Sequence, residues 1–383
     1  MTRPDTGRVA PERRRSPGAP APGRPGGEPP TGAAPDTGTA RIAVDLLGGD
    51  HAPAVVVDGA LRACQADSAL QLLLVGPPDA ADAVTAALPP ADRARVRTLI
   101  PGDRPDLARL RGSGTAPGAT EPGGGDTGAE HGRPGPSAPT ESWVESGVRA
   151  AVLAVAQGQA DAIVSAGNTG ATVTSAALGL GRWPGVRRPA LAAVLPTVAG
   201  RLVLLDVGAS VDPDEQTLGM HAQLGAAYAA TVHGAERPRV GLLTIGTERG
   251  KGDRLRREAP AVLAGLSLPA GAHYVGLLEG NDVVHGAGAD VVVTDGFTGN
   301  ILLKGLETAY ALAGPPPTAS VATDPPPRAA VLLGVAGTVV VCHGAADPDD
   351  LAAGIALAAT LHRRAAVAAI AGMIPLSEVA HDK

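Results

Sequence analysis

The residue types best suited to chemistry in this chain gather in four glycine-rich turns, each of which closes an apolar run. Glycine lets the main chain approach an anion closely, and backbone N–H groups at a helix N-terminus bind anions without a charged side chain. Lys251 lies in the third turn and Asn300 ends the fourth, so both would add polar side-chain groups to these turns. The pattern predicts an anion held between four turns: Leu46–His51, Ser165–Thr172, Gly246–Gly252 and Asp295–Asn300.

Better-known phosphate and nucleophile motifs fit this chain poorly. The run from Gly246 to Lys251 is one residue short of GxxxxGK[ST], and Gly252 stands where a magnesium-binding hydroxyl belongs. The first turn lacks the GxGxxG of a dinucleotide site, and no GxSxG elbow occurs. No spacing indicates a metal site. His51, His221 and His343 are more typical of structural or surface residues than of general bases.

Composition and charge limit the class of protein. With 383 residues and 44% hydrophobic but only 2% aromatic residues, the chain can bury a core of Ala, Val and Leu. A net charge of −6 argues against nucleic acid as a partner. Cys64 and Cys342 match no metal or redox spacing and are expected to be buried thiols. Without an apolar run of membrane-spanning length or a signal peptide, we expect a soluble, cytoplasmic protein.

The elements that must position the turns alternate between strand and helix. We expect strands at 41–46, 70–75, 162–165, 190–195, 202–207, 240–245, 274–278, 291–294 and 338–341. We expect helices at 54–64, 80–87, 144–157, 170–180, 215–232, 253–266, 300–312 and 349–369. This alternation predicts an α/β fold, a parallel sheet covered by helices on both faces. Because the carboxyl ends of parallel strands share one edge, the four turns are expected to converge on one crevice.

Proline and glycine mark the domain limits. Residues 1–40 form a Pro/Gly/Arg-rich segment that we expect to be a disordered tail, and 375–383 a C-terminal tail. Residues 41–374 are expected to form a single domain with flexible insertions near 112–140 and 314–328.

The motifs together resemble a known family. In chain order they are L-L-G-G-D-H-A-P, S-A-G-N-T-G-A, G-R-W-P-G-V-R-R-P-A-L, L-L-D-V-G-A, R-P-R-V-G-L-L-x-I-G, G-K-G and D-V-V-V-T-D-G-F-T-G-N, followed by L-L-G-V and H-G. This collinear set resembles the bacterial phosphate acyltransferases of phospholipid synthesis, the PlsX family, over about residues 41–359 without the insertions.

The resemblance implies a fold, a reaction and a set of site residues. The fold would be a Rossmann-like α/β/α sandwich related to phosphotransacetylases and isocitrate-type dehydrogenases. The reaction would move a fatty acyl group from acyl carrier protein to inorganic phosphate, giving acyl phosphate, in a homodimer without a cofactor. Lys251 and Asn300 fall on the family's catalytic positions. The phosphate- and acyl-binding residues would be Asp45, Gly48, Gly49, His51, Gly167, Asn168, Thr169, Gly170, Asp206, Gly246 and Gly299.

The implied reaction agrees with the glycine turns and suggests how a partner docks. Phosphate attacks the thioester directly, so positioning and charge stabilisation suffice. Lys251 would neutralise charge on phosphate and on the oxyanion, and Asn300 would orient one of them while also capping a helix. Acyl carrier protein is acidic and requires a cationic patch. The docking residues would be Arg182, Arg187, Arg188 and Arg254, with Arg249, Arg256 and Arg257 nearby.

Several positions depart from the family pattern. Leu46-Leu47 replaces Ala-Met, Ser210 replaces Asn, and Ala345-Ala346 replaces two serines. The insertion near 112–140 stands where the family has a polar segment. The helical hairpin associated with dimer contacts and membrane attachment is shortened, which predicts only a weak peripheral contact with the inner membrane face. A non-catalytic paralogue that binds acyl carrier protein or phosphate as a scaffold is the alternative, and coenzyme A an alternative acyl donor.

Overall fold

A computed structural model describes residues 38–101, 141–248, 250–314, 316 and 329–375. The chain divides into two units, residues 1–36 and 37–383, and the first lies outside the described residues. The predictions of a disordered N-terminal tail, of the insertion near 112–140 and of the tail at 375–383 fall almost wholly outside them as well. Of the predicted 314–328 insertion, only Gly314 and Pro316 are described.

One mixed sheet holds the described strands together. Their order across the sheet is β3 (Val96–Leu99), β2 (Leu70–Val75), β1 (Ala40–Asp45), β4 (Ala162–Ser165), β11 (Thr338–Cys342), β10 (Ala329–Leu333), β5 (Ala190–Thr197), β6 (Gly200–Leu205), β9 (Val291–Val293), β7 (Arg239–Leu243) and β8 (His273–Leu278). Seven of the ten neighbouring pairs are parallel. The prediction of a mostly parallel α/β sheet is therefore confirmed.

The three antiparallel pairs change where the turns lie. They join β11 to β10, β10 to β5 and β5 to β6, one after another. Three reversals leave the β1 and β4 group running opposite to the β6, β9 and β7 group. The turns after β1 and β4 therefore lie at one edge of the sheet, and those after β7 and β9 at the other. The expectation that all four turns share one edge is wrong, because antiparallel strands separate the two parallel groups.

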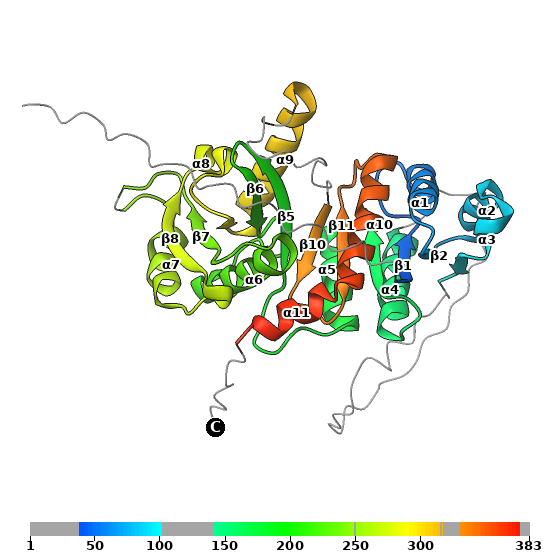
Figure 1. Ribbon diagram of the computed structural model, residues 1–383, viewed down its shortest axis with the longest axis horizontal. Coiled ribbons are helices and arrows are strands. Elements are labelled where there is room, and N and C mark those ends of the chain that lie inside the picture. Colours follow the sequence, from blue (N-terminus) through cyan, green and yellow to red (C-terminus); the bar gives the residue numbers. More distant parts are fainter. Residues whose placement is uncertain (1–37, 102–140, 249, 315, 317–328, 376–383) are drawn as a thin grey trace, which may run out of the picture. The chain divides into compact units, whose positions relative to one another are not determined.

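Helices cover both faces of this sheet. One face packs against α1 (Ala54–Ala66), α2 (Pro78–Ala87), α6 (Glu215–His233), α7 (Arg254–Gly265), α10 (Pro348–Arg363) and α11 (Ala366–Met373). The other face packs against α4 (Glu141–Ala156), α5 (Thr169–Gly179), α8 (Gly280–His285) and α9 (Gly296–Ala313). Strand residues alternate accordingly, since Leu205 faces the first set and Leu204 the second. Helices α1 and α10, from opposite ends of the described chain, lie side by side (Figure 1).

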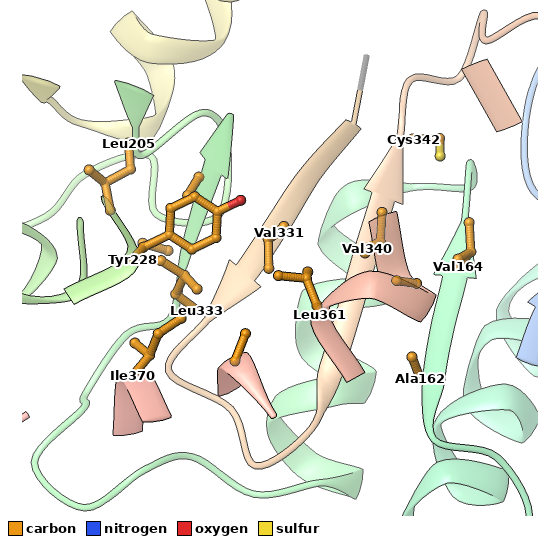
Figure 2. Packing of buried hydrophobic residues seen from close by; sticks show 14 of the residues in the cluster. Ala162, Val164, Leu205, Tyr228, Val331, Leu333, Val340, Cys342, Leu361 and Ile370 are labelled. Carbon is orange, nitrogen blue, oxygen red and sulfur yellow. The ribbon is translucent and has the colours of Figure 1, made fainter. Parts of the chain in front are cut away.

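The core between sheet and helices consists of small aliphatic side chains, as the composition predicts. Figure 2 shows Tyr228 of α6 and Leu361 of α10 beside the β10 residues Val331 and Leu333. Both cysteines are buried free thiols, as expected. Burial raises the pKa of the Cys342 thiol to about 12, so it stays protonated and serves as a packing residue.

Most predicted elements are present, and the differences have local causes. The predicted helix at 349–369 is two helices, α10 and α11, because Ala365 adopts a left-handed φ of 48°. Strand β10 was not predicted, and neither were β3, α3 (Pro90–Arg93), α8 and the short 3₁₀ turn Pro269–Gly271. Among the described helices none is singly long and apolar enough to cross a bilayer, and only the bent pair α10 and α11 passes by length and composition.

Candidate active site

The turns after β1 and β4 pack directly on each other. A Cβ on Gly48 would lie 2.6 Å from the backbone N of Gly167, so only glycine permits this approach. Across the same contact, Ser165 Oγ donates to Asp45 Oδ2 at 2.8 Å and accepts from Gly167 N at 3.0 Å. The structure thus brings together four of the predicted binding residues: Asp45, Gly48, Gly49 and Gly167.

Asp45 is a buried carboxyl with few donors. Burial raises the pKa of Asp45 to about 6, while hydrogen bonds from Ser165 Oγ and the Leu47 N–H act in the opposite direction. The first turn continues to the edge of β11, where Asp50 N donates to Gly344 O at 2.8 Å. His51, a predicted binding residue of this turn, is exposed.

The second turn opens helix α5 as predicted. Asn168 is the N-cap, and its Oδ1 accepts from Ala171 N at 2.9 Å. This use of the Asn168 side chain leaves the first-turn N–H groups of Thr169 and Gly170 without partners inside the helix. They and the helix dipole provide a positive end on this turn.

The turn after β6 is organised by Asp206. Its carboxylate accepts N–H bonds from Leu191, Gly208, Ala209 and Ser210, at 3.0, 3.0, 2.9 and 2.5 Å. Burial raises the pKa of Asp206, and these donors act against the rise. Ser210, where the family pattern has Asn, contributes through its main chain, because its carbonyl also accepts from Gly296 N at 2.8 Å.

His221, a residue of α6, is fully buried next to this turn. Burial lowers the pKa of His221, which favours the neutral ring. Its Nε2 lies 3.3 Å from the carbonyl oxygen of Arg188, while Nδ1 has no hydrogen-bond partner among the described residues. The prediction of a structural role for this histidine fits its position.

The turns after β7 and β9 are joined by Arg256. Its guanidinium bonds the carboxylate of Asp295 and donates to Thr294 Oγ1 at 2.9 Å. Arg256 is therefore buried and paired within the fold. The prediction that it lies near the docking surface as an available cation is wrong. Arg249 lies outside the described residues. The Arg256 contacts fix the loop that carries Lys251 against the helix that carries Asn300.

Lys251 and Asn300 differ in exposure. Lys251 is exposed, its N–H donates to Glu248 O at 3.1 Å, and its side chain passes close to Gly246. Asn300 is half-buried beside Gly208. Helix α9 begins at Gly296 with Asp295 as its N-cap, so Asn300 lies in the second turn of the helix. The expectation that Asn300 caps this helix is wrong, because the Asp295 carboxylate takes that position.

Gly299 explains how α9 approaches Asp206. A Cβ at this position would lie 2.0 Å from the Asp206 carbonyl oxygen, so any side chain would push the helix away. The predicted binding residues Asp206 and Gly299 are therefore in contact, with Asn300 next in sequence.

A cavity of about 580 Å3 lies over β5, β10 and β11, between α5 and α9. Its floor is apolar, from Leu191, Ala193 and Val341. Its walls include the predicted residues Thr169 and Asn300, which come from opposite edges of the sheet. The described lining does not include Lys251.

Sequence reasoning assigned no site role to several polar residues of this cavity, although it named His343 as a structural or surface histidine. They are Lys304, Glu307, Tyr310, His343, Asp347, Asp349 and Asp350. Lys304 Nζ contacts His343 Nε2, and Glu307 Oε2 lies 3.8 Å from the same nitrogen. One signal was available. The chain has three lysines, and Lys304 follows Asn300 by one helical turn, which places both on one face of α9.

The four arginines predicted to dock an acidic partner are exposed: Arg182, Arg187, Arg188 and Arg254. Helix α6 brings two of them to one place. Arg187 pairs with its N-cap Asp214 at 3.4 Å, and Arg254 lies 3.6 Å from Glu215 in its first turn.

Sequence comparison identifies relatives over most of the chain. A family model described as fatty acid synthesis protein matches residues 40–99 and 136–314. The chain is 37% identical over 358 residues to a phosphate acyltransferase of Thermobifida fusca (strain YX), covering 87% of this chain and 91% of the relative. It is 33% identical over 358 residues to one of Heliobacterium modesticaldum (strain ATCC 51547 / Ice1), covering 88% and 98%.

Solved structures share the fold. The chain superposes on the EutD phosphotransacetylase from Staphylococcus aureus with a TM-score of 0.51 and 18% identity, covering 86% of this chain and 94% of that one. For a branched-chain phosphotransacylase from Enterococcus faecalis V583 the TM-score is 0.53 and the identity 14%, covering 85% and 99%. These similarities confirm the predicted phosphotransacetylase-like α/β architecture.

Proposed function

This chain belongs to the phosphate acyltransferase family, and we propose that acyl carrier protein delivers the fatty acyl group that it transfers to inorganic phosphate. The chain is an acyltransferase that makes acyl phosphate for phospholipid synthesis. The identity of the donor, the roles of individual residues and the assembly of the protein are the parts that we propose.

The reaction needs a site that positions two substrates and stabilises charge. A phosphate oxygen attacks the thioester carbonyl carbon, the C–O bond forms and the C–S bond breaks. The thiolate of the carrier's prosthetic arm leaves and takes up a proton. We propose that Lys251 offsets negative charge on the incoming phosphate and that the Asn300 amide donates to the carbonyl oxygen as it becomes an oxyanion. The buried contacts of Arg256 with Thr294 and Asp295 link the loop of Lys251 to the start of the helix that carries Asn300.

One observation carries this proposal: Thr169 and Asn300 line the same cavity, and its floor is apolar. The polar residues suit phosphate and the thioester, whereas Leu191, Ala193 and Val341 suit an acyl chain. A site of this kind combines an apolar surface with a few convergent polar groups, as small-molecule sites generally do.

The test follows acyl phosphate formation from long-chain acyl-acyl carrier protein and inorganic phosphate, with acyl coenzyme A as the competing donor. Removing one oxyanion donor costs about 100-fold or more in kcat, so Asn300→Ala should lose at least that much. The kcat of Lys251→Ala should fall by a comparable factor. The matched control is Arg97→Ala, at an exposed position on the edge strand β3. Equal activity in Asn300→Ala and wild type would contradict the assignment.

The alternative of a non-catalytic scaffold is not favoured. Relatives that share most of the chain are named phosphate acyltransferases. Ser210 retains main-chain contacts with Asp206 and Gly296, so its departure from the family pattern leaves the Asp206 turn intact. Ala346 is buried, and its N–H donates to His343 O at 2.9 Å.

The assembly of the protein is also a proposal. We propose a cytoplasmic homodimer with a weak peripheral membrane contact, supported by the exposed side chains of Phe297 and Ile301, four residues apart on α9. Sedimentation of wild type and Phe297→Ser tests the dimer, which should dissociate more readily in the variant. Flotation with anionic vesicles tests the membrane contact separately.

A further inference from the structure

Three of the arginines proposed to dock an acidic carrier belong to one short segment, residues 182–189, which we call the docking segment. It leads directly into β5. Arg187 and Arg188 lie near its end with exposed side chains, and that of Arg187 is 77% exposed. Within the segment, Arg182 Nη1 donates to the carbonyl oxygen of Arg187. The direction in which these cations point therefore depends on what holds the main chain that carries them.

The turn after β6 holds the end of the docking segment and the start of β5. Ser210 Oγ donates to the carbonyl oxygen of Pro189 at 3.4 Å. Asp206 Oδ1 accepts from Leu191 N at 3.0 Å. Because Asp206 and Ser210 belong to the same turn, the docking segment keeps a fixed position relative to that turn.

The arginine side chains themselves make only weak surface contacts. Arg188 Nη1 donates to the carbonyl oxygen of Asp212 at 3.3 Å, and Arg187 pairs with Asp214 at 3.4 Å. Ion pairs in contact with water contribute little, because solvent screens the charges. An acidic partner could therefore take over these guanidinium groups, whereas the main chain beneath them would stay where the fold holds it.

His221 holds that main chain from the interior. Its Nε2 lies 3.3 Å from the carbonyl oxygen of Arg188. A carbonyl oxygen can only accept, so Nε2 carries the proton and donates. The ring is fully buried, and burial lowers the pKa of His221, which favours the neutral form with one N–H. No other described side chain donates to this carbonyl oxygen, so His221 is the interior contact of the Arg188 peptide.

The same turn also contacts the helix of Asn300. The Ser210 carbonyl oxygen accepts from Gly296 N at 2.8 Å, and Gly299 packs against the carbonyl oxygen of Asp206. The docking segment and the start of α9 are thus placed by one turn, on which both pack. A carrier protein bound to the arginines would lie at a set distance from Asn300, as a reaction that depends on positioning requires.

We propose that His221 is a positioning residue for docking of the carrier protein. Its Nε2–H holds the Arg188 carbonyl oxygen and thereby keeps Arg187 and Arg188 directed toward the carrier. The inference rests on the proposed function, since it concerns the partner that delivers the acyl group. His221 touches no substrate, because its ring is fully buried. It therefore affects binding of the protein-bound donor and leaves the transfer step and phosphate binding alone.

Two amide variants of His221 provide the test. The amide nitrogen of glutamine reaches about as far as Nε2, whereas that of asparagine reaches only as far as Nδ1. KM for acyl-acyl carrier protein, KM for phosphate and kcat are measured with the purified full chain. A hydrogen bond corresponds to about fivefold in affinity. His221→Asn should raise KM for the donor by about that factor, with kcat and the phosphate KM unchanged, and His221→Gln should stay close to wild type.

His233 offers a matched control within the same helix. It is the last residue of α6, and its Nε2 is buried without a hydrogen-bond partner among the described residues. His233→Asn removes an imidazole from α6 far along the helix from the docking segment, so it should leave both KM values unchanged. An equal rise in donor KM in His221→Asn and His233→Asn would show that any damage to α6 suffices and would overturn the inference.

A measurement on the wild type covers the case in which His221→Asn does not fold. The imidazole nitrogens are labelled with 15N, and their NMR signals are followed while carrier protein is added. The Nε2 signal of His221 should shift as the carrier binds, and that of His233 should not. A His221 signal that stays constant while the carrier binds would overturn the inference.

The outcomes distinguish this inference from the proposed function. Wild-type turnover with the same donor KM in His221→Asn overturns the role of His221 and leaves the reaction standing. Carrier binding, followed by calorimetry, that weakens in His221→Asn and not in His233→Asn supports the role of His221. If the wild type shows that binding and no turnover, the reaction is overturned and the positioning role stands.

Discussion

The guanidinium of Arg256 bonds the carboxylate of Asp295, and the two side chains are almost completely buried. Arg256 lies in the first turn of α7, just after the loop of Lys251, and Asp295 is the N-cap of the helix that carries Asn300. This ion pair is therefore the structural link between the two residues that we assign to catalysis.

We predict that Arg256→Leu loses both stability and activity. Removing one partner of a buried ion pair costs about 3 to 5 kcal/mol, because the other charge is left without compensation. The free energy of unfolding, from urea denaturation, measures the loss. The matched control is Arg257→Leu, an exposed neighbour that should change stability by less than about 0.5 kcal/mol. Similar losses in both variants would show that the ion pair is unimportant.

A second prediction concerns pH and the buried carboxyl of Asp45. The folded state holds its proton more tightly than the unfolded chain, so stability falls as pH rises from about 3.8 to about 6 and then stays lower. The difference of about two pKa units corresponds to about 3 kcal/mol. Asp45→Asn removes this ionisation. The difference in free energy of unfolding between the variant and wild type should therefore shift in favour of the variant between pH 4 and pH 8.

Thermal unfolding of the two proteins across this pH range provides the measurement. Asp50→Asn, at an exposed position five residues further along, is the control and should follow the wild-type pH profile. A constant difference between Asp45→Asn and wild type at all pH values would contradict the raised pKa of Asp45.

A third prediction tests the apolar floor of the cavity as the acyl surface. Ala193→Leu adds three carbons to the floor at a residue of β5 that lines the cavity. One methylene in a hydrophobic pocket is worth about tenfold or more in kcat/KM. In the variant, kcat/KM for long-chain donors should fall by at least that factor relative to kcat/KM for short-chain donors. An equal loss for every chain length would instead indicate general damage to the fold.

A fourth prediction concerns the arginines around the N-terminus of α6. Charge reversal at exposed cations mainly slows association, because complementary charges steer the encounter of two proteins. Arg187→Glu with Arg188→Glu should raise KM for acyl carrier protein several-fold, more at low salt than at high salt. The phosphate KM should stay constant, and Arg97→Glu on β3 is the control. Unchanged donor kinetics at low salt would exclude these arginines as a docking site.

Local patterns predicted much of the fold, because strand and helix periods are set by neighbours in sequence. The apolar strands and the Asn168 cap of α5 follow from residues within a few positions. Strand β10 was missed since its five residues, Ala329–Leu333, are too short and uniformly apolar to show an alternation. Strand β10 pairs antiparallel with both neighbours, which helps to set the opposite strand directions of the two halves of the sheet. The residues of a strand do not specify locally which other strands it pairs with.

The candidate site divides in the same way. Gly48 and Gly167 are recognisable as glycine turns, but their contact depends on the packing of two strands. Lys304 and His343 are 39 residues apart, and no spacing rule connects them. Asn300 was expected to cap its helix because Gly299 precedes it, whereas Asp295 binds the Thr298 N–H at 2.8 Å and caps the helix earlier.

The position of β11 has a consequence for how the protein is made. This strand comes late in the chain, yet it inserts between β4 and β10 and carries His343 to the cavity. While the chain emerges from the ribosome, the β4 edge must wait for a strand synthesised more than 170 residues later. An open strand edge of that kind invites pairing with another chain. Nascent chains that stall before β11 should therefore be inactive, prone to aggregation and dependent on chaperones.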